Sequence, residues 1–265
     1  MYATDYHRAS SVQEAVNLLS SRPEGKYLAG GMTLIATMKQ RLAAPSDLVD
    51  LRHIPDLKGI AVEGRKVRIG AATPHSDVAG SAALRAVCPA ICYLADRIGD
   101  PHVRHMGTIG GSIANNDPAA DYPAAVLGLG ATVVTDRRSI PADDFFVGLF
   151  ETALEEGEIV TAVTFEAPEK AGYAKFDNPA SRFALAGVFV SRGADGVRAA
   201  VTGAGADGVF RHRGMEDALA SSWSGDALTK VVVDSAGMLS DLHADAEYRA
   251  NLVKVMAKRA VAAAG

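Results

Sequence analysis

Two short glycine segments have the residue types and spacing to bind a phosphorylated ligand. Residues 29–33 read Ala-Gly-Gly-Met-Thr, and residues 107–112 read Gly-Thr-Ile-Gly-Gly-Ser. Consecutive glycines reach positive φ and lack a Cβ, so neighbouring backbone N–H groups can converge on an anion. Hydrogen bonds to a charged group contribute about 1.5–3 kcal/mol each, and four or more would hold a pyrophosphate without a lysine or arginine. Taken alone, each segment is more simply explained as an ordinary tight turn.

Three further patterns carry less chemical information. Residues 203–208 match G-x-G-x-x-G, but too few residues follow for a doubly wound dinucleotide fold, so a surface turn is expected. His102 and His105 are spaced for one helical face, yet the flanking proline and glycine indicate a loop without a third metal ligand. Cys88 and Cys92 are too few to ligate an iron–sulfur cluster, which needs about four thiolates, and are expected to be buried thiols.

Composition limits the classes of function. The chain has 265 residues, a net charge of −4, 48% hydrophobic and 22% charged residues, which are ordinary globular values. This balance lacks the basic excess that nucleic-acid binding requires. No apolar run approaches transmembrane length, and residues 1–10 lack a signal-peptide core. We therefore expect a cytoplasmic protein that needs no disulfide bond or structural metal for its stability.

The first glycine segment is predicted to join a strand to a helix. Lys26 to Ala29 and Leu48 to Leu51 have strand character, and Leu34 to Leu42 has helical character with Thr33 as its N-cap. Strand, turn, helix and strand within so few residues predict a compact β-α-β unit with parallel strands and a right-handed crossover.

The rest of the chain predicts an α+β arrangement in two parts, with the boundary at residues 168–172. Further expected elements are a helix opened by the capping box Ser11 to Glu14, a strand from Val67 to Ala71, a helical stretch from Leu84 to Ile98 interrupted at Pro89, a helix capped by Asp117 and running from Pro118 towards Leu129, strands at Ala131 to Thr135 and Ile159 to Phe165, an antiparallel pair at Phe183 to Ser191 and Val197 to Val201, and helices at Met215 to Ala220, Leu228 to Met238 and Ala244 to Ala263.

The order of several short motifs resembles one known family. Those motifs are Leu28-Ala29-Gly30-Gly31-Met32-Thr33-Leu34, Leu48-Val49-Asp50-Leu51, Ile69 to Thr73, Val103 to Ser112 running into Asp117-Pro118-Ala119-Ala120-Asp121, Ile140 to Phe146, Tyr173-Ala174-Lys175-Phe176, Thr202 to Gly205 and Ala246 to Arg249. In this order, over nearly the whole chain, they are similar to the FAD-binding medium subunits of molybdenum hydroxylases, the carbon monoxide dehydrogenase and xanthine dehydrogenase family.

The resemblance implies a fold and a domain division. The fold is α+β, with a two-part FAD-binding domain of the PCMH type, made of a small β-α-β lobe and a larger mixed lobe, over residues 1–168. A smaller α+β domain similar to the carbon monoxide dehydrogenase flavoprotein C-terminal domain, with antiparallel strands and helices, covers residues 169–265.

The resemblance also implies a set of FAD-binding residues. The two glycine segments would wrap the pyrophosphate and ribityl chain through Ala29, Gly30, Gly31, Met32, Thr33, Thr108, Ile109, Gly110, Gly111 and Ser112. Asp121 would bind FAD hydroxyls, the alternative being a solvated residue in the first turn of a helix. Ile109 would lie against the flavin ring, and Phe183 would lie beside it or in a core strand. Lys175 would approach the cofactor or stay solvated. Met32 departs from relatives that often carry histidine or glutamine at this position.

The function that the resemblance implies is electron transfer without a catalytic acid or base on this chain. A small partner subunit would carry [2Fe–2S] clusters and a large one the molybdenum cofactor, in a dimer of heterotrimers. Electrons would pass through the clusters to FAD on this chain and then to NAD⁺, oxygen or a quinone. Two alternatives remain at this stage. One is a self-contained FAD-dependent reductase resembling UDP-N-acetylenolpyruvoylglucosamine reductase, and the other is an interaction protein that has lost its flavin.

Overall fold

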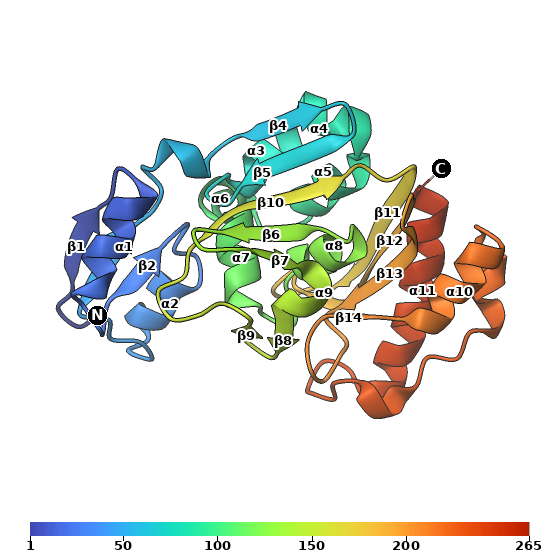
Figure 1. Ribbon diagram of the computed structural model, residues 1–265. Coiled ribbons are helices and arrows are strands. Elements are labelled where there is room, and N and C mark those ends of the chain that lie inside the picture. The colour runs from blue at the N-terminus through green and yellow to red at the C-terminus, as the bar shows by residue number, and fades with distance from the viewer. Residues whose placement is uncertain (265) are drawn as a thin grey trace.

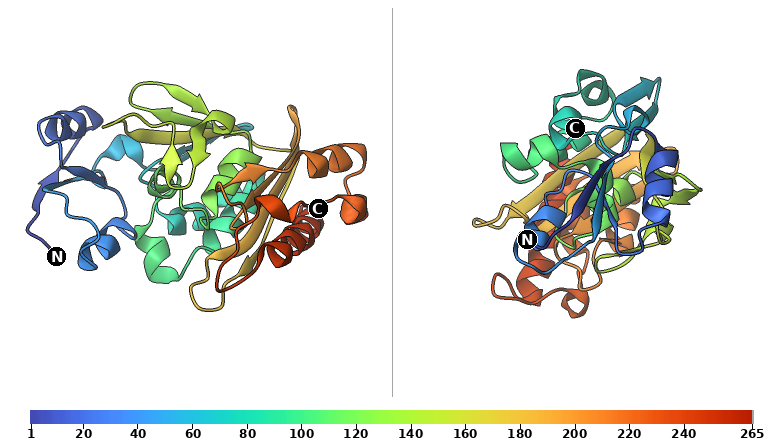
Figure 2. Two further views of the ribbon diagram at one scale, coloured as in Figure 1. Left: turned by 90° about the horizontal axis from the view of Figure 1, so that it is seen from below. Right: turned by 90° about the vertical axis from the view of Figure 1, so that its left-hand side faces the viewer.

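The chain forms three successive groups of elements along one long axis, as the computed structural model shows for residues 1–264 (Figure 1). A parallel sheet lies at one end, a larger antiparallel sheet with its helices lies in the middle, and a second antiparallel sheet covered by the long C-terminal helix lies at the other end. The views of Figure 2 show the same order, with the two chain termini far apart.

The N-terminal group contains the predicted β-α-β unit. Strand β2 (Lys26–Leu28), helix α2 (Leu34–Lys39) and strand β3 (Asp47–Asp50) follow one another, and β2 pairs with β3 in parallel. Strand β1 (Asp5–Arg8), which was not predicted, pairs in parallel with the other edge of β3. The prediction of a parallel unit around the first glycine segment is confirmed.

Helix α1 (Val12–Ser20) covers this small sheet and begins with the predicted cap. The Ser11 hydroxyl accepts a hydrogen bond from the Glu14 amide at 3.1 Å. The Glu14 carboxylate accepts from the Ser10 amide at 2.8 Å, one residue earlier than a standard capping box would place it. A short 3₁₀ helix, η1 (Pro55–Leu57), then leads to the central group.

The central group is a five-stranded antiparallel sheet with helices packed against it. The sheet order is β4-β5-β10-β6-β7, and the strands are β4 (Ile60–Glu63), β5 (Lys66–Gly70), β6 (Thr132–Thr135), β7 (Ser139–Pro141) and β10 (Val160–Glu166). The helices are α3 (His75–Gly80), α4 (Ala82–Val87), α5 (Pro89–Asp96), α6 (Pro101–Met106), α7 (Ile109–Asn115), α8 (Tyr122–Gly128) and α9 (Ala142–Phe145). A two-stranded ribbon, β8 (Phe146–Gly148) with β9 (Glu151–Thr152), completes the group.

Three expectations for the central helices need correction. The segment with His102 and His105 is helix α6 rather than a loop, because Asp100 accepts hydrogen bonds from the first amides of the helix. The second glycine segment is not a free turn, since Gly110 and Gly111 lie in the first turn of α7, capped by Thr108. Helix α8 begins at Tyr122 rather than at Pro118, because the Asp117 carboxylate accepts from the Ala119 amide in a turn before the helix.

The C-terminal group explains the long apolar run in the predicted strand pair. The antiparallel sheet has the order β11-β12-β13-β14, with β11 (Lys170–Asp177), β12 (Ala184–Gly193), β13 (Gly196–Thr202) and β14 (Phe210–Arg211). On β12, Phe189 faces the central core, whereas Val188 and Val190 face α10 (Arg213–Ser221) and α11 (Ala246–Ala263). A strand that is buried on both faces has no polar side to alternate with.

Two predictions in the C-terminal group differ from the structure. The helix predicted over Leu228 to Met238 is replaced by two 3₁₀ turns, η2 (Gly225–Lys230) and η3 (Ser235–Gly237), each opened by its own side-chain cap, Ser224 and Asp234. Residues 203–208 form a turn as expected, and the short strand β14 rather than a helix follows it. Most of this turn is buried, however, and not at the surface. The Gly203 amide donates to the Pro118 carbonyl at 2.8 Å, which ties this turn to the central group.

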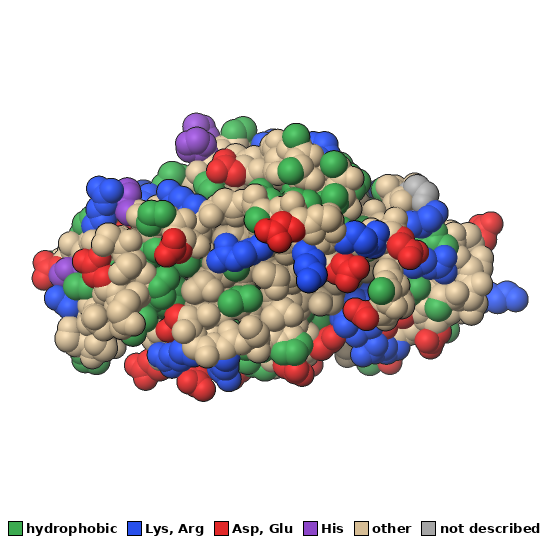
Figure 3. All heavy atoms as spheres, turned by 45° about the horizontal axis from the view of Figure 1, so that its top comes forward, with side chains coloured by type: hydrophobic (Ala, Val, Ile, Leu, Met, Phe, Trp, Pro, Cys, Tyr) green, Lys and Arg blue, Asp and Glu red, His purple; other side chains and the backbone are tan. Residues whose placement is uncertain are grey.

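The structure confirms the prediction that the two cysteines are buried thiols. Cys88 and Cys92 are buried and unpaired, and no group of ligands suited to a metal ion occurs in the described part of the chain. Figure 3 shows acidic and basic side chains interspersed over one face, without a broad basic patch. Within residues 1–264, no helix is both long and apolar enough to cross a membrane.

Candidate functional site

A cavity of about 880 Å³ lies where the N-terminal group meets the central one. Its walls come from the β2–α2 connection, the first turns of α7, the loop before α6, the segment before β10 and the loop that joins β11 to β12. Ligand cavities form preferentially at such junctions between units. Among the predicted site residues, those that line it are Ala29, Gly30, Gly31, Met32, Thr33, Thr108, Gly110, Gly111, Ser112, Asp121 and Phe183.

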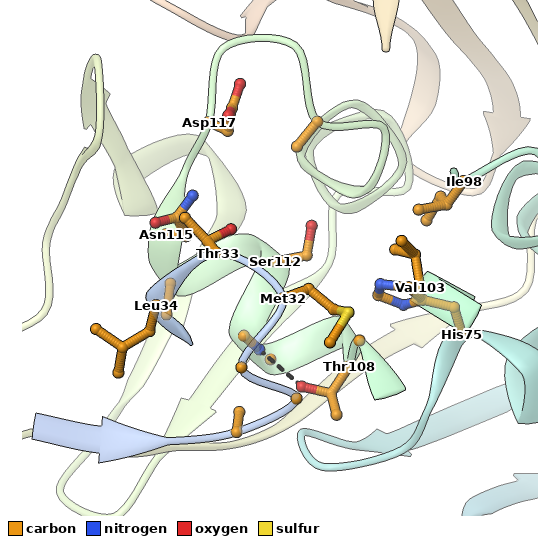
Figure 4. Close-up of a pocket in the computed structure, with 18 of the residues that line it drawn as sticks. Met32, Thr33, Leu34, His75, Ile98, Val103, Thr108, Ser112, Asn115 and Asp117 are labelled. Carbon is orange, nitrogen blue, oxygen red and sulfur yellow. Dashed lines mark hydrogen bonds between the residues drawn. The ribbon is translucent and has the colours of Figure 1, made fainter. Parts of the chain in front are cut away.

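The first glycine segment offers free backbone donors. The N–H groups of residues 30–33 make no hydrogen bond to any part of residues 1–264. Gly31 has a φ of +72°, which favours glycine at this position. Thr33 has helical backbone angles and does not cap α2 with its side chain, contrary to prediction, so its hydroxyl stays free at the cavity wall (Figure 4). This arrangement fits a phosphate cradle.

The second glycine segment works differently from the prediction. The amides of Gly110 and Gly111 donate to the Ala71 carbonyl at 2.9 Å and to the Thr108 hydroxyl oxygen at 3.1 Å, so neither is left for a ligand. The hydroxyls of Thr108 and Ser112 lie at the cavity wall instead (Figure 4). In this segment the glycines allow neighbouring segments of the chain to pack closely, and the hydroxyl side chains offer polar contacts to a ligand.

The two glycine segments also pack against each other. A Cβ added at Gly30 would collide with the Met106 carbonyl and would lie 2.7 Å from the Gly107 Cα. A Cβ at Gly111 would lie 3.0 Å from the Thr108 hydroxyl oxygen and 3.3 Å from the Ala29 Cβ. Because real Cβ atoms do not approach within 3 Å of other heavy atoms, Gly30 is needed for this contact between the two groups of elements.

Asp121 is neither solvated nor alone. It is buried at the start of α8, where its carboxylate accepts from the Tyr173 hydroxyl and pairs with the Lys175 ammonium at 3.0 Å. Burial raises the pKa of Asp121, against the opposing effect of Lys175. The alternative of a solvated helix residue is therefore wrong, and the carboxylate lies at the cavity wall with strand β11 behind it.

Lys175 and Ile109 do not line the cavity. The Lys175 side chain is only 1% exposed, because its ammonium donates to the Arg97 carbonyl at 2.9 Å and pairs with Asp121. The expectation of a solvated lysine is thus overturned. Ile109 is fully buried in the central core, because the first turn of α7 directs its side chain inward. These two residues can therefore affect a ligand only by positioning neighbouring residues that do line the cavity.

Phe183 lies at the cavity wall and not in a core strand. It immediately precedes β12 and its side chain is 49% exposed. The neighbouring Arg182 has a φ of +62°, and its guanidinium donates to the Gly99 carbonyl at 3.5 Å. The loop 180–183 therefore brings an aromatic ring to the cavity wall, next to the segment 98–100 that also lines the cavity.

Two further wall residues, His75 and Glu158, were not predicted from the sequence. Burial, together with the charge of Arg104, lowers the pKa of His75 from 6.5 to about 4. The Arg138 guanidinium, at 2.9 Å, lowers the pKa of Glu158 to about 2, so this carboxylate is ionised. Only their tertiary surroundings distinguish them from any other histidine and glutamate.

Comparisons with known proteins agree on one family. Residues 2–167 match the family described as FAD binding domain in molybdopterin dehydrogenase. The chain is 39% identical to the carbon monoxide dehydrogenase medium chain of Afipia carboxidovorans, over 97% of this chain and 95% of that one. It is 35% identical to the nicotine 6-hydroxylase medium subunit of Paenarthrobacter nicotinovorans, over 99% and 98%. The fold matches a chain of carbon monoxide dehydrogenase from Oligotropha carboxidovorans with a TM-score of 0.90 and 36% identity, over 100% and 99%.

Proposed function

Because the chain belongs to the family of FAD-binding domains of molybdopterin dehydrogenases, and so is an FAD-binding oxidoreductase subunit, we propose that it is the electron relay of a molybdenum hydroxylase complex. A small subunit with [2Fe–2S] clusters delivers electrons that a large molybdenum subunit takes from the substrate. This chain holds the FAD and passes the electrons to NAD⁺, oxygen or a quinone. The full-length similarity to medium chains, including the C-terminal group, carries this proposal and disfavours a self-contained reductase.

Different cavity residues contact different parts of the cofactor. The free amides of residues 30–33 and the hydroxyls of Thr108 and Ser112 bind the pyrophosphate. Asp121 accepts hydrogen bonds from FAD hydroxyls, and Phe183 covers one side of the flavin ring at the rim. Bound FAD supplies the redox chemistry, which needs no acid or base from the protein.

Residues behind the wall position those that contact the cofactor. Tyr173 and Lys175 fix the Asp121 carboxylate from strand β11, so the C-terminal group contributes to the site without touching FAD. Ile109 packs in the core under α7 and fixes the helix that presents Thr108 and Ser112.

We propose that substrate choice lies outside this chain. The relatives named above act on carbon monoxide and on nicotine according to their names, yet both match this chain over nearly its full length. A shared medium subunit with different substrates is expected if substrate binds at the molybdenum of another subunit.

Anaerobic reconstitution tests the relay. The chain is loaded with FAD and mixed with substrate, first alone and then together with the small and large subunits from its own genomic neighbourhood. We expect the flavin absorption to bleach only in the assembled complex, and a complex that lacks the small subunit to stay oxidised. Bleaching of the chain alone by an organic substrate would instead identify a self-contained enzyme.

A further inference from the structure

His75 is a polar wall residue for which the protein itself supplies no partner. It is the first residue of α3, is only 4% exposed, and points into the space bordered by Met32, Val103 and Thr108 (Figure 4). Neither ring nitrogen makes a hydrogen bond to residues 1–264; Nδ1 is completely buried, whereas Nε2 is not and is the nitrogen that a ligand in the cavity can reach. Buried polar groups in folded proteins nearly always have a partner, so this imidazole is an exception that requires an explanation.

The chain keeps the ring in this place by packing alone. The ring lies 5.2 Å from that of Tyr122, centroid to centroid, and a Cβ added at Gly107 would lie 2.5 Å from Nε2. The backbone of His75 is fixed independently, because its amide donates to the Gly107 carbonyl at 2.9 Å. Gly107 thus leaves room for the imidazole at the point where the two glycine segments meet.

The charge state of His75 suits a contact with an uncharged or anionic acceptor. Its lowered pKa, about 4, keeps the ring neutral at physiological pH, with one nitrogen as donor and the other as acceptor. The nearby Arg104 guanidinium already donates to the Ile98 and Gly99 carbonyls, so it does not take the free acceptor.

We propose that His75 is a further cofactor-contact residue, whose imidazole Nε2 hydrogen-bonds to an oxygen of the bound FAD where the two glycine segments meet. This inference rests on the proposed placement of the pyrophosphate between those segments. It adds a side-chain contact beside Met32, whose own side chain offers no hydrogen bond.

FAD titration of the full-length chain, freed of flavin, tests the proposal. The measured quantity is the FAD dissociation constant, from quenching of flavin fluorescence, for wild type, His75→Leu and His75→Gln. Because a hydrogen bond to a charged group contributes about 1.5–3 kcal/mol, His75→Leu should weaken binding roughly 10- to 100-fold. His75→Gln, which keeps a donor and an acceptor, should recover a large part of that loss.

Two controls separate this contact from a structural role. Tyr122→Phe removes the neighbouring unpaired hydroxyl and should bind FAD like wild type. The thermal unfolding midpoint of flavin-free His75→Leu should equal or exceed that of wild type, because an unpaired buried polar group is removed.

Unchanged FAD affinity in His75→Leu would overturn the proposal. So would an equal loss in Tyr122→Phe, which would indicate a bond between the two side chains instead. Failure of the wild-type chain to bind FAD would contradict the proposed function itself, and is distinct from either outcome.

Discussion

At the scale of single residues, Gly111 is a wall position at which an added side chain would reach into the proposed cofactor site. Gly111→Asp would place a carboxylate beside Thr108 and Ala29, at the wall assigned to the pyrophosphate. We expect FAD affinity to fall by ~100-fold or more, from lost contacts and like-charge repulsion worth about 3 kcal/mol. Gly237→Asp adds the same charge at an exposed position with open space around it, and should retain FAD fully. Normal flavin content in Gly111→Asp would refute the placement of the pyrophosphate.

His75 should leave a signature in the pH dependence of stability. Its pKa is about 4 in the folded chain and near 6.5 when unfolded, so the unfolded state binds more protons between these values. The neutral buried ring therefore makes its full contribution to the free energy of unfolding above pH 6.5. This free energy falls by about 3 kcal/mol as the pH falls towards 4. Chemical denaturation of flavin-free wild type and His75→Leu at pH 7 and pH 4 measures this. Equal pH dependence in the two proteins would contradict the burial argument.

At the scale of elements, one buried ion pair joins strand β11 to helix α8. Lys175→Met would leave the Asp121 carboxylate buried without its cation. Breaking such a pair by removing one partner costs about 3–5 kcal/mol, and Asp121 would become protonated and bind FAD hydroxyls less well. We expect lower unfolding free energy and weaker FAD binding, whereas the exposed Lys230→Met should change neither. Wild-type FAD affinity in Lys175→Met would show that Asp121 needs no help from β11.

The same elements show what the sequence could and could not predict. The β-α-β unit was predictable because its strands, glycines and helix are signalled locally within residues 26–51. Helix α7 was not, because consecutive glycines disfavour helices, and this one depends on the Thr108 cap and on the Ala71 carbonyl of another element. The predicted site residues that line the cavity were found through family resemblance. The burial of Lys175 and the isolation of His75 arise only when distant segments pack.

At the scale of the whole molecule, the predicted boundary at residue 168 does not separate two independent cores. The central core includes Tyr173, Phe189 and Ala200 from the C-terminal sheet, packed with helices of the central group. We keep the division 1–168 and 169–265 as a proposal about chain organisation only. A fragment of residues 1–168 should expose the central core and lack a cooperative thermal transition by circular dichroism. A cooperative fragment that binds FAD like the full chain would contradict this dependence.

The central claim is that this chain by itself holds one FAD between its two glycine segments. The most direct measurement is the visible absorption spectrum of the purified full-length chain after FAD is added and unbound cofactor is removed. We predict oxidised flavin bands with about one FAD per chain, and none in Gly111→Asp. A wild-type chain that stays colourless would contradict the account and leave only a flavin-free interaction protein.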